Sequence, residues 1–387
     1  MLASPFKAGR ELTLGIIGGG QLAKMLAQAA YRLGLRVAII EHGADSPAGR
    51  MTQLEFPDGW TSPEALNAFV DASDIITLEN EFVAPELLQA IAQRRPVYPT
   101  PETIARVRDK LVQKQTMAAA GIPVPAFAGV ATPEEVLSFA RTRGFPLVLK
   151  SRTFGYDGYG NATLDTAEEL PRAWEMLWQR VQHEGILVEE FVPLQKELAV
   201  IVARSRRGEL AVYPCVETVQ QDHVCRVVYA PAPLPEPLRR QAQELAVACV
   251  EAIDGVGVFA VELFLSQDGT ILFNEIAPRP HNSGHYTIEA CYTSQFENAI
   301  RAVCGLPLGS PEMFVPAAVM VNLLGVRSGS GIPDAVTEAL RVGKAWIHLY
   351  GKRESRPRRK MGHVTAVGAT LEEAYRLAQQ AADGIMW

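Results

Sequence analysis

The chain has 387 residues, of which 48% are hydrophobic and 21% charged, and its formal net charge is −6. This length and composition predict a globular protein of two or three domains, exclude a membrane-spanning run, and argue against broad electrostatic binding of nucleic acid. The first residues hold no continuous apolar stretch and the five cysteines are scattered, so we expect a cytoplasmic protein without a secretory signal, a disulfide framework or a zinc site.

The first predicted unit alternates short apolar runs with amphipathic segments between Leu12 and Pro99. Such alternation is typical of a parallel α/β sheet, so a Rossmann-like domain is predicted. Its opening, LGIIGGGQLA, places Gly18 and Gly20 at a strand-to-helix turn whose backbone N–H groups would face an anion. Because Glu41 ends the next apolar run, a dinucleotide site is one interpretation. The helix after the turn stops at Gly34 and carries one apolar face, formed by Leu22, Met25, Leu26, Ala29, Ala30 and Leu33.

A single helix is predicted next, from its N-cap Thr100 to Gly121. Arg106, Lys110 and Lys114 recur at four-residue spacing on one face of this helix. From periodicity alone, a solvated helix face is favoured over a ligand-binding one.

Two segments in the strand-rich middle of the chain suit a nucleotide. Lys150 ends the apolar run PLVLK and precedes the glycine-rich stretch SRTFGYDGYGN, so one cation and several backbone N–H groups could surround phosphates. The Walker A spacing is absent, and a glycine-rich hairpin without a ligand is the alternative. Farther along, ILVEEF contains the consecutive acids Glu189 and Glu190, which suit an adenine edge and ribose hydroxyls or simply lie at an exposed strand end.

The segment VELFLSQDGTILFNE predicts a hairpin with a two-residue turn at Asp268 and Gly269. In that register Glu262 stands opposite Glu275, and two like charges destabilise such a pair unless a cation lies between them. Two carboxylates are a typical protein contribution to Mg²⁺ bound with substrate phosphates, which predicts a nucleoside triphosphate. The alternative is a longer turn with the two glutamates slipped or exposed.

From about Ala318 the chain mixes predicted strands with the basic run GKRESRPRRKMGH and ends in a helix over 371–382. A solvated loop or a weak nucleic-acid patch is the plain interpretation of such a run.

The order of these signals resembles that of the ATP-grasp superfamily. Within it, NEIAPRPHNSGH, GKRESRPRRKMGH and GGGQLAKML together resemble the 5-(carboxyamino)imidazole ribonucleotide synthase family, and the resemblance covers nearly the whole chain. It implies a fold of the α/β and α+β classes, with a Rossmann-like domain over 1–114, an ATP-grasp domain over 115–317 and a small β-rich domain over 318–387. A mobile flap subdomain would span about 125–192. The implied reaction joins ATP, bicarbonate and 5-aminoimidazole ribonucleotide through carboxyphosphate, in purine biosynthesis.

The resemblance also implies a role for each matching residue. Glu262 and Glu275 would hold Mg²⁺, with Mn²⁺ as the alternative. Arg279 would hold bicarbonate or carboxyphosphate, while Asp157, His281 and His285 are candidates for moving a proton. ATP would contact Lys110, Lys150, Gly155, Tyr156, Asp157, Gly158, Tyr159, Gly160, Asn161, Glu189, Glu190, Phe191, Val192, Glu197, Asn274 and Glu275. The ribonucleotide would contact Gln21, Leu22, Glu81, Tyr156, Arg279, Asn282 and Ser283, and its 5′-phosphate would contact Lys352 and Arg359.

Three residues depart from the family pattern: Tyr159 and Asn161 in the glycine-rich loop, and Gln220 where many relatives have histidine. Tyr159 puts one phosphate contact of the glycine-rich loop in doubt. The partners implied are small molecules and a second copy of the chain, without nucleic acid or membrane. The alternatives are a NAD-dependent dehydrogenase, another ATP-grasp ligase such as a formate-dependent glycinamide ribonucleotide transformylase or a biotin carboxylase, and a nucleotide-binding module without turnover.

Overall fold

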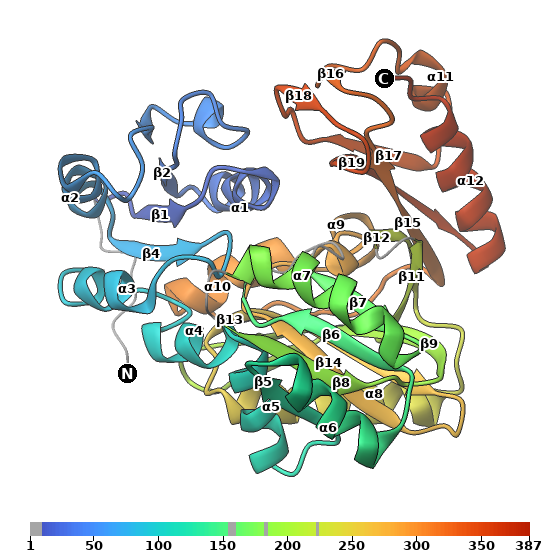
Figure 1. Ribbon diagram of the computed structural model, residues 1–387. Helices are drawn as coiled ribbons and strands as arrows, with labels where there is room; N and C mark the ends of the chain where they lie inside the picture. Colours follow the sequence, from blue (N-terminus) through green and yellow to red (C-terminus); the bar gives the residue numbers. More distant parts are fainter. Residues whose placement is uncertain (1–9, 154–159, 182–184, 222–223) are drawn as a thin grey trace.

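The computed structural model describes residues 10–153, 160–181, 185–221 and 224–387. In Figure 1 the N-terminal part lies at the upper left and the C-terminal part at the upper right, and both rest on the larger central part. No helix of the described residues is long and apolar enough to cross a membrane.

The N-terminal part is built on a parallel sheet in the order β3-β2-β1-β4, as the alternating pattern predicts. Its strands are β1 (Thr13–Ile17), β2 (Arg36–Ile40), β3 (Leu54–Phe56) and β4 (Ile75–Leu78). Its helices are α1 (Gln21–Arg32), α2 (Pro63–Ala72) and α3 (Pro85–Ala92), and a short 3-10 helix spans Gly49–Met51.

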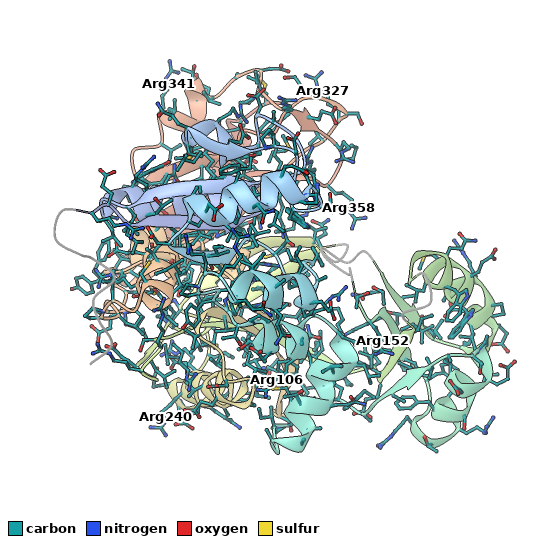
Figure 2. The ribbon with its side chains drawn as sticks, turned by 90° about the vertical axis from the view of Figure 1, so that its left-hand side faces the viewer. Arg106, Arg152, Arg240, Arg327, Arg341 and Arg358 are labelled. Atoms are coloured by element: carbon teal, nitrogen blue, oxygen red, sulfur yellow. The ribbon has the colours of Figure 1, made fainter. Side chains whose placement is uncertain are left out.

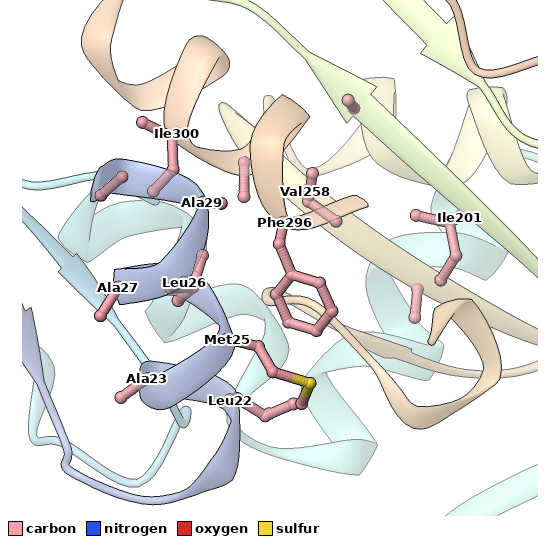
Figure 3. Packing of buried hydrophobic residues seen from close by; sticks show 14 of the residues in the cluster. Leu22, Ala23, Met25, Leu26, Ala27, Ala29, Ile201, Val258, Phe296 and Ile300 are labelled. Carbon is pink, nitrogen blue, oxygen red and sulfur yellow. The ribbon is translucent and has the colours of Figure 1, made fainter. Parts of the chain in front are cut away.

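Helix α1 joins this sheet to the centre of the molecule. The predicted apolar face is confirmed, because Leu22, Met25 and Leu26 are each at most 7% exposed. Figure 3 shows these side chains facing Phe296 and Ile300 of α10 (Gln295–Cys304). The apolar side chains of the GGGQLAKML motif therefore belong to the hydrophobic core. Only the polar groups of this motif could contact a ligand.

The glycine turn before α1 holds an anion, but the anion belongs to the protein. The Gly20 and Leu22 N–H groups donate to the Glu79 carboxylate, at 2.5 and 3.2 Å, and the Gly19 N–H donates to Glu41 at 2.8 Å. Burial raises the pKa of Glu79, while the backbone donors at the helix start oppose that effect. The donors that a dinucleotide pyrophosphate would need are thus already engaged.

We expect Gly20→Ala to lower the free energy of unfolding by about 1–3 kcal/mol, the cost of leaving a buried polar group unpaired. Gly20 has an extended backbone that alanine tolerates, but an added Cβ would lie 2.3 Å from Glu79 Oε1. Urea unfolding measures the loss. Gly343→Ala is the matched control, since its Cβ would meet nothing within 4 Å; equal effects of the two substitutions would contradict the packing argument.

The single helix predicted between Thr100 and Gly121 is wrong. Two helices occupy this segment, α4 (Pro101–Val107) and α5 (Lys110–Ala119), and Asp109 caps the second by accepting from the Leu111 N–H. Arg152 contacts both oxygens of the Asp109 carboxylate, Oδ1 through Nε and Oδ2 through Nη2, and thereby stabilises the break. The break ends the supposed continuous basic face.

A small antiparallel sheet in the order β5-β8-β6-β7 projects from the central part, as Figure 2 shows near Arg152. Its strands are β5 (Phe127–Val130), β6 (Leu147–Ser151), β7 (Asn161–Leu164) and β8 (Ile186–Glu190), covered by α6 (Pro133–Arg143) and α7 (Leu170–Val181).

The largest sheet follows the antiparallel order β14-β13-β9-β11-β12-β15-β19-β17, with β10 beside β9. Its strands are β9 (Leu194–Arg204), β10 (Leu210–Val212), β11 (Val216–Gln221), β12 (Val224–Ala230), β13 (Gly257–Ser266), β14 (Ile271–Ala277), β15 (Ala317–Leu324), β17 (Ala345–Leu349) and β19 (Lys360–Gly368). The helices of this region are α8 (Glu236–Ala252), α9 (Thr287–Ala290), α10, α11 (Thr337–Leu340) and α12 (Leu371–Asp383), and β16 (Gly329–Ser330) pairs with β18 (Glu354–Ser355).

Because β15 pairs with β12 on one side and β19 on the other, the sheet continues past residue 317 into the C-terminal part. The C-terminal strands are therefore fixed to the central part by main-chain hydrogen bonds.

Candidate active site

A cavity of about 260 Å³ lies where strands of the small sheet face strands of the large one. It brings together residues predicted to bind ATP or metal, together with residues that the prediction did not include. The predicted residues at its wall are Lys150, Asn161, Glu189, Glu190, Phe191, Val192, Glu197, Glu262, Asn274, Glu275 and His281. The other wall residues are Val148, Thr163, Leu194, Gln220, Cys225, Phe264 and Lys360.

Glu262 and Glu275 stand directly opposite each other on β13 and β14, as the sequence predicts. The predicted two-residue turn is nevertheless wrong. The Ser266 N–H donates to the Thr270 carbonyl oxygen at 3.0 Å, so three residues, 267–269, form the loop. A three-residue loop shifts the pairing by one position, and by itself it would separate the two glutamates.

A β-bulge on β14 corrects this shift. Leu263 pairs with Phe273, whereas the next pair toward the site is Glu262 with Glu275, so Asn274 is the extra residue. The bulge directs Asn274 into the cavity, where its Oδ1 accepts from Lys150 Nζ at 3.1 Å. The local irregularity thus places an amide beside the carboxylate pair.

A cation and a neutral imidazole lie beside the two opposed carboxylates. Lys110 Nζ forms an ion pair with Glu275, and His281 Nε2 lies 3.5 Å from Glu262 Oε1. Burial and the neighbouring Arg279 lower the pKa of His281 well below its ordinary value, so the ring is neutral. The Ser283 N–H can only donate to His281 Nδ1, at 3.4 Å, from which we infer that the ring proton lies on Nε2 and faces Glu262.

The carboxylate pair fits a magnesium ion in charge and ligand type. Among the described residues, no group of three or more histidine, cysteine, aspartate or glutamate side chains is arranged to hold a metal. A pair suffices for Mg²⁺, which keeps water and substrate phosphates as its other ligands. The Lys110 ammonium already at Glu275 lies where such a positive charge is needed.

Two buried lysines share one carboxylate at the floor of the cavity. Glu189 lies 2.8 Å from Lys150 Nζ and 3.1 Å from Lys114 Nζ, and its side chain is 2% exposed. Burial alone would raise the pKa of Glu189, but Lys150 and Lys114 outweigh it and lower the pKa to about 2. Burial lowers the pKa of Lys114 to about 8. The Glu189 carboxylate is therefore engaged by the two lysines.

Lys110 is the third lysine of this group. Burial, followed by repulsion from Lys150, lowers its pKa to about 8. Glu197, on the opposite wall, has a pKa raised to about 7 by burial and by the nearby Glu262 charge, while Gln220 donates a hydrogen bond that opposes the rise. A site with several groups this strongly perturbed is typical of a functional centre.

The residues predicted for the second substrate lie next to this cavity, where the N-terminal part meets β14. Arg279 forms a bidentate ion pair with Glu81, through Nε at 2.7 Å and Nη2 at 3.2 Å. Arg279 outweighs the effect of burial and lowers the pKa of Glu81. An oxyanion at Arg279 must therefore approach another edge of the guanidinium or displace Glu81.

The other residues that were predicted to contact the ribonucleotide are packed against or hydrogen-bonded to neighbouring residues. Gln21 and Leu22 form the first turn of α1, where the Leu22 side chain is buried. Asn282 is buried and exchanges hydrogen bonds with Asn322, at 2.8 and 2.6 Å, and Ser283 Oγ lies 2.9 Å from His281 Nδ1. These contacts fix the loop that also carries Arg279.

The basic run of the C-terminal part divides between two environments. Lys352 Nζ lies 5.7 Å from the centre of the Tyr350 ring, and Arg359 Nη1 donates to the Glu354 carbonyl oxygen at 2.8 Å. Lys360 lines the cavity, whereas Lys352 and Arg359 do not. Of the glycine-rich loop, Gly160 and Asn161 are described, and Gly155, Tyr156, Asp157, Gly158 and Tyr159 lie outside the described residues.

Comparisons with known proteins match the three regions of the chain in order. Residues 12–108 match the ribonucleotide synthetase preATP-grasp domain, residues 115–296 the ATP-grasp domain, and residues 318–376 the phosphoribosylaminoimidazole carboxylase C-terminal domain. The N5-carboxyaminoimidazole ribonucleotide synthase of Mycobacterium tuberculosis is 42% identical over 377 residues, which are 95% of this chain and 86% of the relative. The chain belongs to the N5-carboxyaminoimidazole ribonucleotide synthase family.

Solved structures of this synthase family agree with the fold. The Thermotoga maritima enzyme is 40% identical with a TM-score of 0.85, covering 97% of this chain and 99% of its own. The Aspergillus clavatus enzyme, in complex with ADP and 5-aminoimidazole ribonucleotide, is 36% identical with a TM-score of 0.88, covering 96% and 98%. The predicted family, fold class and enzyme class, an ADP-forming ATP-grasp ligase, are thereby confirmed, and the dehydrogenase alternative is wrong.

Two lysines of this synthase-family site escaped prediction. Lys114 is 1% exposed, so interpreting its helix face as solvated is wrong at this position. The four-residue spacing between Lys110 and Lys114 was the only sequence signal that the two lysines act together. This spacing could not show that Lys114 has the buried partner Glu189. Lys360 directly follows Arg359 at the start of β19, and strand alternation is the signal that sends neighbouring residues to opposite sides.

Proposed function

We propose that the chain joins bicarbonate to the exocyclic amine of 5-aminoimidazole ribonucleotide, with ATP converted into ADP and phosphate through carboxyphosphate. ATP-dependent carboxylation of this ribonucleotide in purine biosynthesis is the activity of the family to which the chain belongs. The proposal adds the carbon source, the metal and the role of each residue. The observation that carries it is the opposed pair Glu262 and Glu275, which lines one cavity together with Lys150 and in which Glu275 forms an ion pair with Lys110.

The chemistry explains why such a cavity is needed. Bicarbonate is a poor electrophile because its carbon already carries delocalised negative charge, and its leaving group would be hydroxide. Phosphorylation by ATP supplies a better leaving group, and the nascent charge requires compensation at the transferring phosphoryl group. Lys110 and Lys150 supply positive charge from a buried setting, where electrostatic interactions are stronger than in water.

In this proposal Glu262 and Glu275 hold Mg²⁺, and the ion supplies charge neutralisation at the ATP phosphates when it is bound. Glu197 and the wall residues of segment 189–192 hold ribose and adenine. Arg279, which forms an ion pair with Glu81 in this structure, orients bicarbonate. The neutral His281 stays close enough to exchange a proton with a group at Glu262.

The domain division at residues 114 and 317, a homodimeric state and a cytoplasmic location belong to the same proposal. Helix α5 spans the first of these boundaries.

ADP release tests the proposal directly. The reaction is run with ATP, Mg²⁺, bicarbonate and 5-aminoimidazole ribonucleotide, and each component is omitted in turn. We expect ADP release to depend on all four. Release that persists without the ribonucleotide, or that requires formate in place of bicarbonate, would overturn the assignment in favour of another ATP-grasp ligase.

We expect Lys352→Ala and Arg359→Ala each to raise the KM for the ribonucleotide at least about tenfold, the effect of one charge-assisted contact. A monophosphate needs cations that do not compete for the ATP phosphates, and these two residues lie outside the nucleotide cavity. Steady-state kinetics with each substrate varied in turn measure the effect, and the KM for ATP should change little. Loss of ATP binding with normal saturation by the ribonucleotide would place the basic run at the nucleotide site.

A further inference from the structure

The turn that carries Lys352 is held from the N-terminal part of the molecule. Lys24 Nζ donates to the carbonyl oxygens of Leu349 and Tyr350, at 2.9 and 3.4 Å. The Arg50 guanidinium donates to the carbonyl oxygen of the next residue, Gly351. Two cations separated from this turn by about three hundred positions therefore bind three consecutive carbonyl groups beside Lys352.

These contacts depend on the local backbone. Gly351 has a φ of +76°, a left-handed conformation that favours glycine. A Cβ at this position would lie 3.3 Å from Arg50 Nη2 and 3.7 Å from Lys24 Nζ. Partial burial and the nearby Arg50 charge lower the pKa of Lys24, so its carbonyl partners compensate a real desolvation cost.

The two ends of the turn are fixed differently. Tyr350 is 2% exposed and its hydroxyl lies 3.0 Å from His363 Nδ1, so the residue before the turn is anchored in the C-terminal core. Gly351 then links this anchor to Lys352. On the far side of Lys352, the Arg353 carbonyl oxygen accepts from the Gly331 N–H at 2.8 Å. Because glycine leaves the backbone direction open, the hydrogen bonds from Lys24 and Arg50 fix the turn on the side of Lys352 that Gly351 forms.

We propose that Lys24 is a positioning residue for the ribonucleotide: it binds the carbonyl oxygens of Leu349 and Tyr350 and thereby fixes Lys352 at the 5′-phosphate. This inference rests on the proposed function. It makes the phosphate site depend on contact between α1 and the C-terminal part, although Lys24 itself does not touch the substrate.

Three single variants test the inference. Lys24→Met keeps the length of the side chain without its charge, and Lys24→Arg keeps the charge and the donors. Asp45→Asn is the matched control, because Asp45 pairs with Arg353 of the same turn through side chains that are 62% and 63% exposed. We expect Lys24→Met to raise the KM for the ribonucleotide about tenfold, with kcat and the KM for ATP changed less than about twofold. Lys24→Arg should recover most of the loss, and Asp45→Asn should change the KM less than about twofold.

A double variant separates positioning from direct contact. If Lys24 acts through Lys352, Lys24→Met combined with Lys352→Ala is no worse than Lys352→Ala alone. Multiplying effects would mean independent phosphate contacts and would overturn the inference. Amide hydrogen exchange at residues 350–353 should also be faster in Lys24→Met, and unchanged exchange would overturn it equally.

The same experiments test the role of Lys24 separately from the proposed function on which it rests. If Lys352→Ala leaves the KM for the ribonucleotide unchanged, the proposed phosphate anchor is wrong and the inference falls with it. If Lys352→Ala raises that KM while Lys24→Met does not, only the role of Lys24 is overturned.

Discussion

Glu262→Gln and Glu275→Gln are each expected to lower kcat at least about a thousandfold, equivalent to ~4 kcal/mol of transition-state stabilisation. Glutamine keeps the shape of the side chain but removes the charge that a divalent cation requires. The two carboxylates stand opposite each other on β13 and β14. The side chain next to either one on its strand points to the other face of the sheet and cannot take over its role. Initial rates of ADP release, measured against magnesium concentration, give the effect.

The turn of the same hairpin offers a control. Asp268 Oδ1 accepts from the Thr270 N–H at 2.9 Å, outside the cavity, so Asp268→Asn is expected to change stability slightly and kcat less than about twofold. Circular dichroism and urea unfolding establish that the glutamine variants are folded. Full turnover in both glutamine variants would remove the metal assignment, and a comparable loss in Asp268→Asn would trace the effect to hairpin stability.

This hairpin also shows how far strand alternation reaches. Alternation and a turn signal were enough to pair Glu262 with Glu275, but they led to a two-residue turn where three residues form the loop. The bulge at Asn274 restores the pairing that the longer loop would have lost. A bulge depends on how the bulged strand packs and has no reliable local pattern, so the correct pair was predicted through two errors that cancel.

The lysines of α5 show a different limit. Spacing within one helix cannot reveal that Lys114 is neutralised by Glu189, which lies 75 positions away on β8. Without that partner, a solvated lysine is the correct expectation, because burying an unpaired ammonium is costly. Only the tertiary structure, which places Glu189 beside Lys114, shows that this lysine is buried.

The glycine turn was predicted correctly as an anion site but not as an internal one. Gly18, Gly20 and a following helix create the same donors whether a phosphate or a side chain receives them. Glu79 receives them here, and it follows the strand that lies beside β1. Adjacency of β1 and β4 is a property of the sheet order, which the glycine pattern alone does not encode.

Glu189→Gln is expected to lower the free energy of unfolding at pH 7 by about 3–5 kcal/mol, the usual cost of breaking a buried ion pair on one side. The amide fits the same space, so little packing is lost. Lys114 and Lys150, which are 1% and 7% exposed, would then face each other without a counter-charge. Urea unfolding at pH 7 measures the change, and a loss under about 1 kcal/mol would contradict a net role for the buried pair.

An exposed pair provides the matched comparison. Arg240 and Glu244 lie 3.6 Å apart with side chains that are each 70% exposed. Glu244→Gln removes the same charge in water, so its effect should stay within about 0.5 kcal/mol. The difference between the two glutamine variants then isolates burial as the cause.

The pH dependence separates charge from packing in the Glu189 variant. The folded-state pKa of Glu189 is about 2, below the ordinary 4.5, so its stabilisation is present above pH 4.5 and is lost as the pH falls toward 2. Glu189→Gln should therefore flatten the acid limb of the stability curve. At the other end, the pKa of Lys114 is already about 8 and falls further without Glu189, because its positive neighbours remain. Lys114 of the variant therefore loses its proton at a lower pH than Lys114 of the unsubstituted protein, and the deficit of the variant should shrink as the pH rises from about 6 to about 8, above which both lysines are neutral. A deficit of constant size across that range would mean that lost packing, and not unpaired charge, destabilises the variant.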